Sequence, residues 1–339
     1  MIFDPSKNSI LQNNWSNETL NDLINACIIF RPQYLILDCC DEYETKMGFR
    51  HLSFRSLITL AKRNNIKVFL MLGSKGLEPL PGDIQELVDY CTVQYFPTNF
   101  IATTTKTILD TIPEKLVDVN RPTQFTQMYY CFVNRPHRWR CSFVDLLHKH
   151  NADKIGKYTW NKLTKDFLGD QYKFSHWEEK IITGNDGYCE PSNFHRPEEL
   201  YHDSFMEIVL ESAVHIIFIT EKTLKPLAWG KPFLVYAGPG FHGYLKELGF
   251  KLYTEIFDYS FDNIENDVKR AEAIITQINT LHNTRSYNDM YTQLKSKIEY
   301  NQKHLVKLHK DVAFNRLNHI SKWITDIAKY TVQMKNSLI

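Results

Sequence analysis

Two short, almost wholly apolar segments in the first third of the chain restrict what it can fold into. They are YLILDCC, residues 34–40, and IKVFLMLG, residues 66–73, and they flank the amphipathic stretch HLSFRSLITLAKRNN. Apolar runs without alternation are typical of strands that are buried on both faces of a parallel sheet. In the intervening stretch the apolar residues fall on one helical face: Leu52, Phe54, Leu57, Leu60 and Ala61. Strand, helix and strand predict a βαβ unit.

The same alternation continues along the chain and then begins again in the second half. DIQELVDY predicts a helix, and CTVQYF predicts a third strand. Residues 97–127 are rich in Thr, Pro and Asn, and we interpret them as a linker. Beyond them, RWRCSFVDLLHKHN predicts a helix with Phe143, Leu146 and Leu147 on its apolar face, and four segments predict strands: MYYCFV, FMEIVLES, HIIFIT and PFLVYAG.

These patterns predict an α/β chain with two Rossmann-like domains. We place the first at residues 1–120 and the second at 121–285. Apolar residues return at helical spacing from Asp267 onward, and residues 286–339 are rich in Lys, Asn and Gln. We therefore expect a C-terminal helical segment over 286–339.

Composition favours a soluble enzyme. Of 339 residues, 43% are hydrophobic and 23% charged, and a net charge of +1 provides no overall field that would attract nucleic acid or an anionic membrane. Local basic patches are compatible with that balance. The chain has no apolar run of about 18 residues and no signal-peptide pattern at its start, so we expect no membrane span and a cytoplasmic location. The seven scattered cysteines form no Cys-x-x-Cys pair, which fits a reducing compartment without a zinc site.

The most informative stretch for function is IIFITEKTLKPLAWGKPFLVYAGPG, residues 216–240. Thr220 predicts a helix N-cap and Gly230 a C-cap. In the ordinary interpretation, Glu221 favours the helix dipole by roughly 0.3–1 kcal/mol and Lys222 is a solvated surface charge. In the functional interpretation, the pair lies beyond the carboxyl end of a parallel strand, where ligands of such sheets bind. A carboxylate there can accept both ribose hydroxyls of a nucleotide, and the ammonium can pair with its phosphates.

The segments around this stretch resemble a known family. F-x-E-I-V-L-E-S, then I-T-E-K, then G-K-P-F-L-V and a Gly-rich turn are similar to the donor-binding motif of the α-1,3-fucosyltransferases. Glu211-Ser212 stands where that family has Glu-Asn. The resemblance implies a GT-B fold, with two Rossmann-like domains and a cleft between them, and a GDP-sugar as the donor. It also implies that the Gly-rich turn, with Gly238 and Gly240, lets the backbone approach that donor.

A second similar block lies upstream, in the expected order. YYCFVNRPHRWRCSFVDLLHKHN resembles the family's strand, loop, arginine and helix, in which the arginine holds the donor diphosphate. Arg140 stands at the matching position, with Arg138 and Arg135 as nearby alternatives. A cation at a helix start is unfavourable against the dipole, which supports a phosphate partner. The resemblance covers about residues 129–244.

The resemblance implies a metal-independent sugar transfer, and the chain has no Asp-x-Asp for a divalent ion. Lys222 and Arg140 would stabilise the departing diphosphate, and Glu221 would orient the ribose. Glu211 would either contact the sugar or brace the site. We expect no cofactor beyond the nucleotide-sugar itself.

An inverting transfer also needs a general base on the acceptor domain. The family's glutamate has no clear equivalent after residues 66–73, where Glu78 lies several residues on. Asp38, Asp41 and Glu42, at the exit of residues 34–40, are alternative bases, although they are more often ordinary strand-end carboxylates. A retaining mechanism would need no such base.

Several alternatives stay open. The expected acceptor is a glycan or another hydroxyl group, and a modified base of duplex DNA is the alternative; the lack of a basic stripe in the N-terminal half counts against DNA. The chain could also be a decayed GT-B module that holds a nucleotide without turnover, or an interaction protein whose Glu-Lys pair only caps a helix. His137 and His242 are more often loop histidines than ligands, and Trp139 and Trp229 more often pack against the sheet.

Overall fold

The structure, a computed structural model, comprises two compact units. The first unit is Met1–Thr103 with His309–Ile339, and the second unit is Thr104–Leu308. The described residues are 2–4, 9–13, 17–39, 52–75, 82–111, 124–133, 137–159 and 202–336. Side chains are described over 22–37, 54–75, 82–110, 124–133, 137–159 and 202–312. Each unit is an α/β structure, and its sheet is wholly or mainly parallel, as the sequence predicts.

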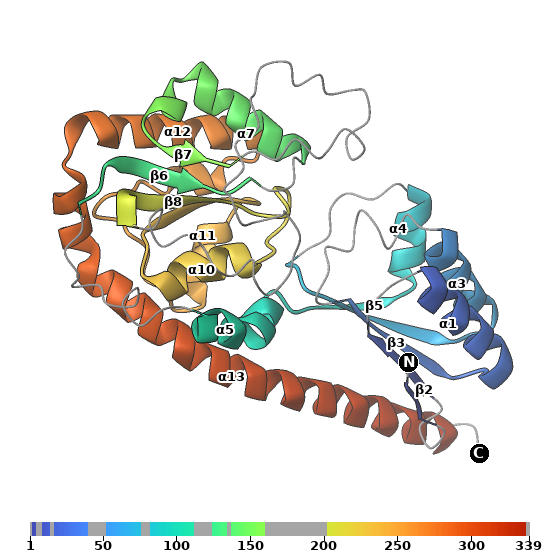
Figure 1. Cartoon of the computed structure of the whole chain (residues 1–339). Helices are drawn as coiled ribbons and strands as arrows, with labels where there is room; N and C mark the ends of the chain where they lie inside the picture. The colour runs from blue at the N-terminus through green and yellow to red at the C-terminus, as the bar shows by residue number, and fades with distance from the viewer. Residues whose placement is uncertain are drawn as a thin grey trace. The chain divides into compact units, whose positions relative to one another are not determined.

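The first unit is built on a five-stranded sheet in the order β1-β2-β3-β4-β5. Strands β2 to β5 are parallel, and β1 is antiparallel to β2. In Figure 1, α1, α3 and α4 gather on the same side of this sheet, and α3 packs against both of the others. The elements are β1 (Ile2–Asp4), β2 (Ser9–Asn13), α1 (Asn17–Phe30), β3 (Tyr34–Cys39), α3 (Leu52–Arg63), β4 (Lys67–Leu72), α4 (Gly82–Asp89) and β5 (Thr92–Tyr95).

The core of the first unit confirms the predicted helix face. Phe54, Leu57 and Ala61 of α3 are fully buried, and Leu60 is partly buried against the same cluster. They pack against the apolar side chains of β3 and β4, such as Leu35, which is also fully buried. Burial of this kind contributes roughly 1.5–3 kcal/mol for each large apolar side chain.

The interpretation of residues 97–127 as a linker is wrong over its first part. Helix α5 (Asn99–Thr111) occupies it, with Ile101, Thr105 and Ile108 buried at helical spacing. The Thr-rich composition obscured this pattern, because threonine has a low intrinsic helix propensity that burial of one face overrides. The two units divide within α5, whereas we predicted a boundary at residue 120.

The C-terminal helical segment is confirmed in type. It is a single helix, α13 (Tyr287–Asn336), preceded by α12 (Asp267–Thr284). Its first part belongs to the second unit and its last part to the first unit, so it is not a separate body. Met290, Leu294 and Ile298 are buried at helical spacing on its first part.

The second unit is built on a four-stranded, wholly parallel sheet in the order β7-β6-β8-β9. In Figure 1, α7 and α12 cover one face of this sheet and α10 covers the other. The elements are β6 (Gln127–Cys131), α7 (Arg138–Lys149), η1 (Ala152–Lys154), β7 (Lys157–Tyr158), β8 (Ser204–Leu210), α10 (Glu221–Trp229), β9 (Phe233–Tyr236), α11 (Phe241–Glu247) and η4 (Ser260–Asn263).

The strand order creates a topological switch point between β6 and β8. From β6 the chain passes through α7 to β7 on one side, and from β8 it passes through α10 to β9 on the other. The helices that follow the two central strands therefore diverge to opposite faces of the sheet (Figure 1). In open α/β sheets, ligands bind outside the carboxyl ends of the strands at such a point.

The prediction of a strand at HIIFIT is wrong, because these residues belong to no strand of the sheet. β8 and β9 pair directly, with Glu207 opposite Phe233, and the segment between β8 and α10 is an irregular buried loop. A buried apolar run looks the same in sequence whether it lies in a strand or in such a loop. The guanidinium of Arg270 in α12 satisfies part of the loop backbone by donating to the carbonyl of Val214 at 2.7 Å.

Among the residues that the structure describes, none belongs to a helix with the length and apolarity needed to cross a membrane.

Candidate functional site

The switch point brings the start of α7 and the start of α10 to the end of β8. Thr220 is the N-cap of α10, as predicted: its backbone is extended, and its Oγ1 accepts a hydrogen bond from the Lys222 amide at 3.3 Å. Gly230 is the predicted C-cap, with a left-handed backbone at φ 66° and ψ 44°. The N-terminus of α10, with its positive dipole end, therefore opens beside the β8 exit.

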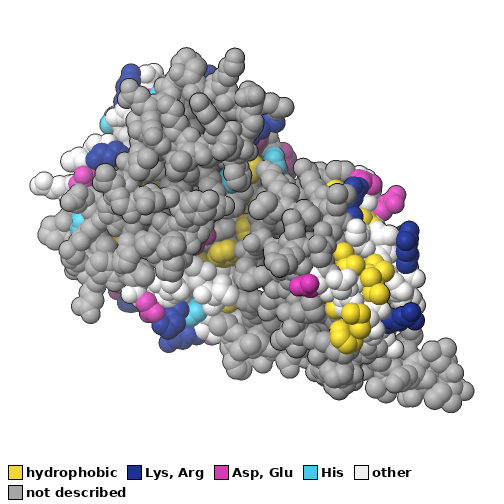
Figure 2. Space-filling view, turned by 45° about the vertical axis from the view of Figure 1, so that its right-hand side comes forward, with side chains coloured by type: hydrophobic (Ala, Val, Ile, Leu, Met, Phe, Trp, Pro, Cys, Tyr) yellow, Lys and Arg dark blue, Asp and Glu magenta, His cyan; other side chains and the backbone are white. Residues whose placement is uncertain are grey.

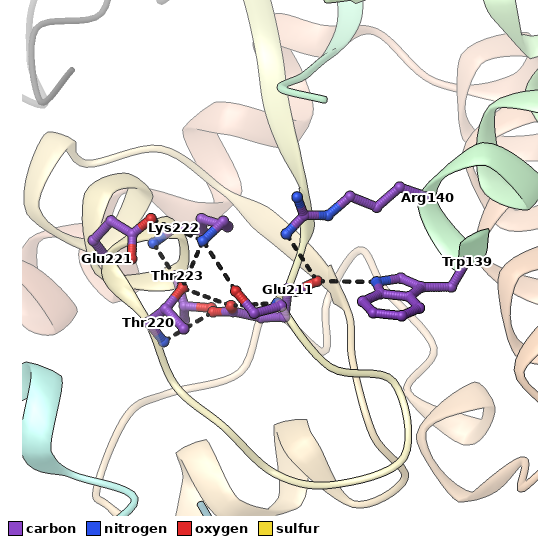
Figure 3. A network of polar contacts seen from close by, with 8 residues as sticks. Trp139, Arg140, Glu211, Thr220, Glu221, Lys222 and Thr223 are labelled. Carbon is purple, nitrogen blue, oxygen red and sulfur yellow. Dashed lines mark hydrogen bonds and ion pairs between the residues drawn. The ribbon is translucent and has the colours of Figure 1, made fainter. Parts of the chain in front are cut away.

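Glu211, directly after β8, is the centre of a buried hydrogen-bond network (Figure 3). Its Oε1 accepts from the Thr220 amide at 3.1 Å and the Thr223 hydroxyl at 2.6 Å. Its Oε2 accepts from the Thr220 hydroxyl at 2.6 Å and the Ser212 amide at 3.2 Å. Four bonds take up the usual acceptor capacity of a carboxylate, so Glu211 braces β8 against α10 and has no acceptor site to offer a sugar.

Arg140 and Trp139 attach the start of α7 to the same strand end. The backbone carbonyl of Glu211 accepts from Arg140 Nη2 at 3.1 Å and from Trp139 Nε1 at 3.3 Å. Both side chains are buried, at 3% and 7% exposure. Arg138 is exposed at the first position of α7, and Arg135 lies outside the described residues. Of the two described arginines, Arg140 is therefore the one whose side chain reaches Glu211.

Lys222 reaches the same strand end from α10. Its ammonium donates to Glu221 Oε1 at 2.8 Å, to Ser212 Oγ at 3.2 Å and to Thr220 Oγ1 at 3.3 Å. With 26% of its side chain exposed, it is neither a solvated surface charge nor fully enclosed. Figure 3 shows Arg140 and Lys222 on opposite sides of Glu211. The structure thus brings together two cations from separate helices.

The described side chains at the site include more cations than carboxylates. Burial would raise the pKa of Glu221, but the ammonium groups of Lys222 and Lys225 and the hydrogen bond from Lys222 outweigh burial and lower it to about 2. Glu221 is therefore a carboxylate at neutral pH. Among the charged side chains that the structure describes at this strand end, three are cations (Arg140, Lys222 and Lys225) and two are carboxylates (Glu211 and Glu221), and the N-terminus of α10 adds partial positive charge. Such an arrangement favours an anion over a cation.

The Gly-rich turn after β9 is shaped by contacts within the chain. A Cβ at Gly238 would lie 2.4 Å from the backbone oxygen of Ile216, so only glycine fits there. Gly240 is the N-cap of α11 and has a left-handed backbone, with φ 76°. Both glycines thus have structural reasons that involve no ligand, and the prediction that they approach the donor stays a prediction.

His242 is a structural residue, as its ordinary interpretation predicts. It is 1% exposed, its Nδ1 lies 2.9 Å from Asp262 Oδ1, and its Nε2 accepts from the Val235 amide at 3.1 Å. Because Nε2 accepts, the proton lies on Nδ1 and is donated to the carboxylate. The other histidine and the two tryptophans that we considered as ligand contacts also pack within the chain. The His137 ring stacks on the Trp139 ring with their centroids 4.7 Å apart, and Trp229 is buried.

The side chains of the four candidate general bases are not among those that the structure describes. Asp38 lies in β3, paired in register with Met71 of β4, and its side chain is not described. Asp41, Glu42 and Glu78 lie outside the described residues. The prediction that one of them is a base stays a prediction.

Sequence reasoning missed three contributors to this site. Thr223 supplies a hydroxyl to Glu211, Trp139 supplies its indole N–H, and Lys225 adds a second ammonium beside Glu221. Thr223 and Lys225 lie three and five residues after the N-cap Thr220, on the first turns of α10. Had the first turn of the helix been projected from that cap, Thr223 would have been predicted to lie beside Glu211.

Comparisons with models of known protein families and with curated proteins find no match to this chain. Over the part of the chain that the structure describes, no group of three or more His, Cys, Asp or Glu side chains is placed to hold a metal ion.

Proposed function

We propose that the chain is a glycosyltransferase that binds a nucleotide-sugar in its second unit. The observation that carries the proposal is the convergence of Arg140 and Lys222 on the Glu211–Ser212 turn at the topological switch point. Two cations and a helix N-terminus at the carboxyl ends of parallel strands are the features that recognise a diphosphate. The resemblance to α-1,3-fucosyltransferases favours a GDP-sugar, a GT-B arrangement and a glycan or other hydroxyl acceptor.

The local contacts support distinct roles for the site residues. Lys222 is partly exposed and can exchange its hydrogen bonds to Glu221 and Ser212 for bonds to phosphate oxygens. Glu221 is ionised and 22% exposed, as an acceptor for ribose hydroxyls must be. Positive charge fixed at this point stabilises the charge that develops on a departing nucleoside diphosphate. The transfer would then need no metal ion.

Nucleotide binding by matched variants tests this proposal. Lys222→Ala removes the partly exposed cation, and Lys246→Ala, on the exposed side of α11 in the same unit, removes the same charge away from the site. GDP and UDP should each be titrated against the three proteins by calorimetry. Loss of a charge-assisted hydrogen bond of about 1.5–3 kcal/mol predicts roughly 10- to 150-fold weaker binding to K222A, with K246A near wild type. Equal affinities for all three proteins, or no nucleotide binding, would contradict the proposal.

Turnover separates an enzyme from a module that only holds a nucleotide. The full-length chain should release nucleoside diphosphate from a GDP-sugar or UDP-sugar above the background rate, and K222A should release it more slowly. If the chain binds the nucleotide but releases no nucleoside diphosphate with any donor and acceptor tried, the nucleotide site stands and the transferase activity is refuted.

A further inference from the structure

The last turn of α1 exposes three consecutive large apolar side chains. Ile28 is 54% exposed, Ile29 71% and Phe30 49%, whereas Leu23 and Cys27 on the inner face are each 1% exposed. The other exposed large apolar residues in the described part of the chain are isolated in sequence: Val268, Tyr300 and Val306. Single exposed apolar residues are ordinary, but a contiguous group marks an interaction surface.

Basic side chains lie at the same edge of the sheet as this turn. α1 ends at the amino edge of the first unit's sheet, where Tyr34 of β3 pairs with Lys67 of β4. Exposed Arg31 follows α1 directly, and exposed Lys62 and Arg63 end α3, which packs against α1. Figure 2 shows a group of apolar side chains on this unit, with both Lys or Arg and Asp or Glu side chains near it.

The acidic side chains that the structure describes at this edge lie farther along it. Glu86 and Asp89 are exposed in the last turn of α4, and α3 lies between α4 and α1. At the last turn of α1 and the end of α3 the described charges are Arg31, Lys62 and Arg63, whereas Asp22, an exposed carboxylate of α1, lies nearer the middle of that helix. An apolar tip with a basic rim is the composition that peripheral proteins use at anionic lipid surfaces.

We propose that this edge of the first unit, formed by Ile28, Ile29, Phe30, Arg31, Lys62 and Arg63, docks on an anionic phospholipid membrane. The isoleucines would enter the boundary between headgroups and acyl chains, and the guanidinium and ammonium groups would pair with lipid phosphates. No transmembrane segment is required for this contact. The carboxyl ends of the same strands lie at the opposite edge of the sheet.

Charge favours lipid over a second copy of the chain as the occupant. A two-fold interface centred on Ile29 would bring the same patch of both copies together. Arg31 and the two basic residues that end α3 would then bring three positive charges from each copy into one interface, against the single described carboxylate of α1, Asp22, and such an excess of like charge is unfavourable. An anionic membrane neutralises them instead. This proposal is independent of the nucleotide site, because the residues that carry it lie in the other unit.

Vesicle co-sedimentation of the full-length chain tests the proposal. Wild-type protein should sediment with vesicles that contain phosphatidylserine and not with vesicles of phosphatidylcholine alone, and added salt should release it. The paired change Ile28→Ser and Ile29→Ser should abolish sedimentation. Lys62→Gln with Arg63→Gln should weaken it about 5-fold for each charge removed. Val268→Ser, an equally simple loss of an exposed apolar side chain in the second unit, should leave it unchanged.

Circular dichroism melts of each variant separate lost docking from lost folding, since these side chains are exposed and their loss should not shift the melting temperature. Binding to neither type of vesicle, or equal binding to both, would overturn the proposal. So would a wild-type dimer that Ile29→Ser converts to a monomer, because the patch would then be an interface between copies of the chain.

Discussion

Replacing Glu211 by glutamine tests the network that organises the candidate site. The substitution keeps the shape of the side chain but turns one carboxylate oxygen into an NH₂ donor. Each oxygen now accepts from one backbone amide, Oε1 from Thr220 and Oε2 from Ser212. Whichever way the new amide is oriented, its donor group faces a backbone N–H and cannot pair with it.

The expected cost follows from those contacts. One hydrogen bond to a charged acceptor is lost, which costs about 1.5–3 kcal/mol, and a partner N–H loses its acceptor at a cost of about 1–3 kcal/mol. The threonine hydroxyls can reverse their roles and recover part of this. We therefore expect Glu211→Gln to lower the free energy of unfolding by about 3 kcal/mol, a large share of the roughly 5–15 kcal/mol of a typical domain.

Urea unfolding followed by tryptophan fluorescence measures this loss, and we expect the midpoint to fall by about 1–2 M at unchanged slope. Glu299→Gln is the matched control, because Glu299 is half exposed on α13 and makes only a surface pair with Lys303. Hydrogen exchange of the β8 amides should rise in E211Q, which localises the effect to the second unit. A loss below about 1 kcal/mol in E211Q, or one equal to that in E299Q, would refute the account of this network.

Three further predictions concern the same unit. Gly230→Ala should destabilise the second unit by about 1–2 kcal/mol, because φ is +66° and a Cβ would lie 2.8 Å from the side chain of Gln302. Gly82→Ala, with open space around the new Cβ, should not be destabilising, and thermal melts of the two variants make the comparison. Asp262→Asn should cost at least about 2 kcal/mol, measured by urea unfolding, because its carboxylate accepts from two amides and the imidazole at the start of α11; a cost within the experimental error would be contrary to this. The pKa of Glu221 is lowered from 4.5 to about 2, so its contribution, on the order of 3 kcal/mol, should be complete above pH 5 and lost as the pH falls from about 4.5 towards 2. Stability measured against pH for wild type and Glu221→Gln should therefore converge in acid, and curves that stay parallel would contradict this sign.

The regular part of the fold could be predicted because its signals are local. The apolar runs that became β3 and β4 are too continuous for an exposed strand, and the face of α3 is buried as its spacing indicates. The caps of α10 could be predicted for the same reason: Thr220 is a residue type that N-caps favour, and Gly230 is the type that a left-handed C-cap favours.

The failures lie where tertiary contacts override local pattern. HIIFIT is apolar because it belongs to a buried loop that contacts α12 and the turn at Gly238. No periodicity in the sequence distinguishes such a buried loop from a buried strand. The sheet strands β1 and β2 carry no strong signal, since β1 has three residues and lies at an edge. In the site, the sequence predicted that Arg140 and Lys222 act together, but it placed Lys222 after the strand HIIFIT, which is absent, and not at the exit of β8. The sequence could not show that the carboxylate of Glu211 accepts all four of its hydrogen bonds from groups of the chain itself.

A crystal structure of the chain with bound GDP tests the central claim most directly. We predict diphosphate oxygens within about 2.7–3.2 Å of Lys222 Nζ, beside the Arg140 guanidinium at the Glu211–Ser212 turn. The ribose hydroxyls should lie at Glu221. A nucleotide bound elsewhere, with Lys222 still donating to Glu221 and Ser212, would contradict the claim.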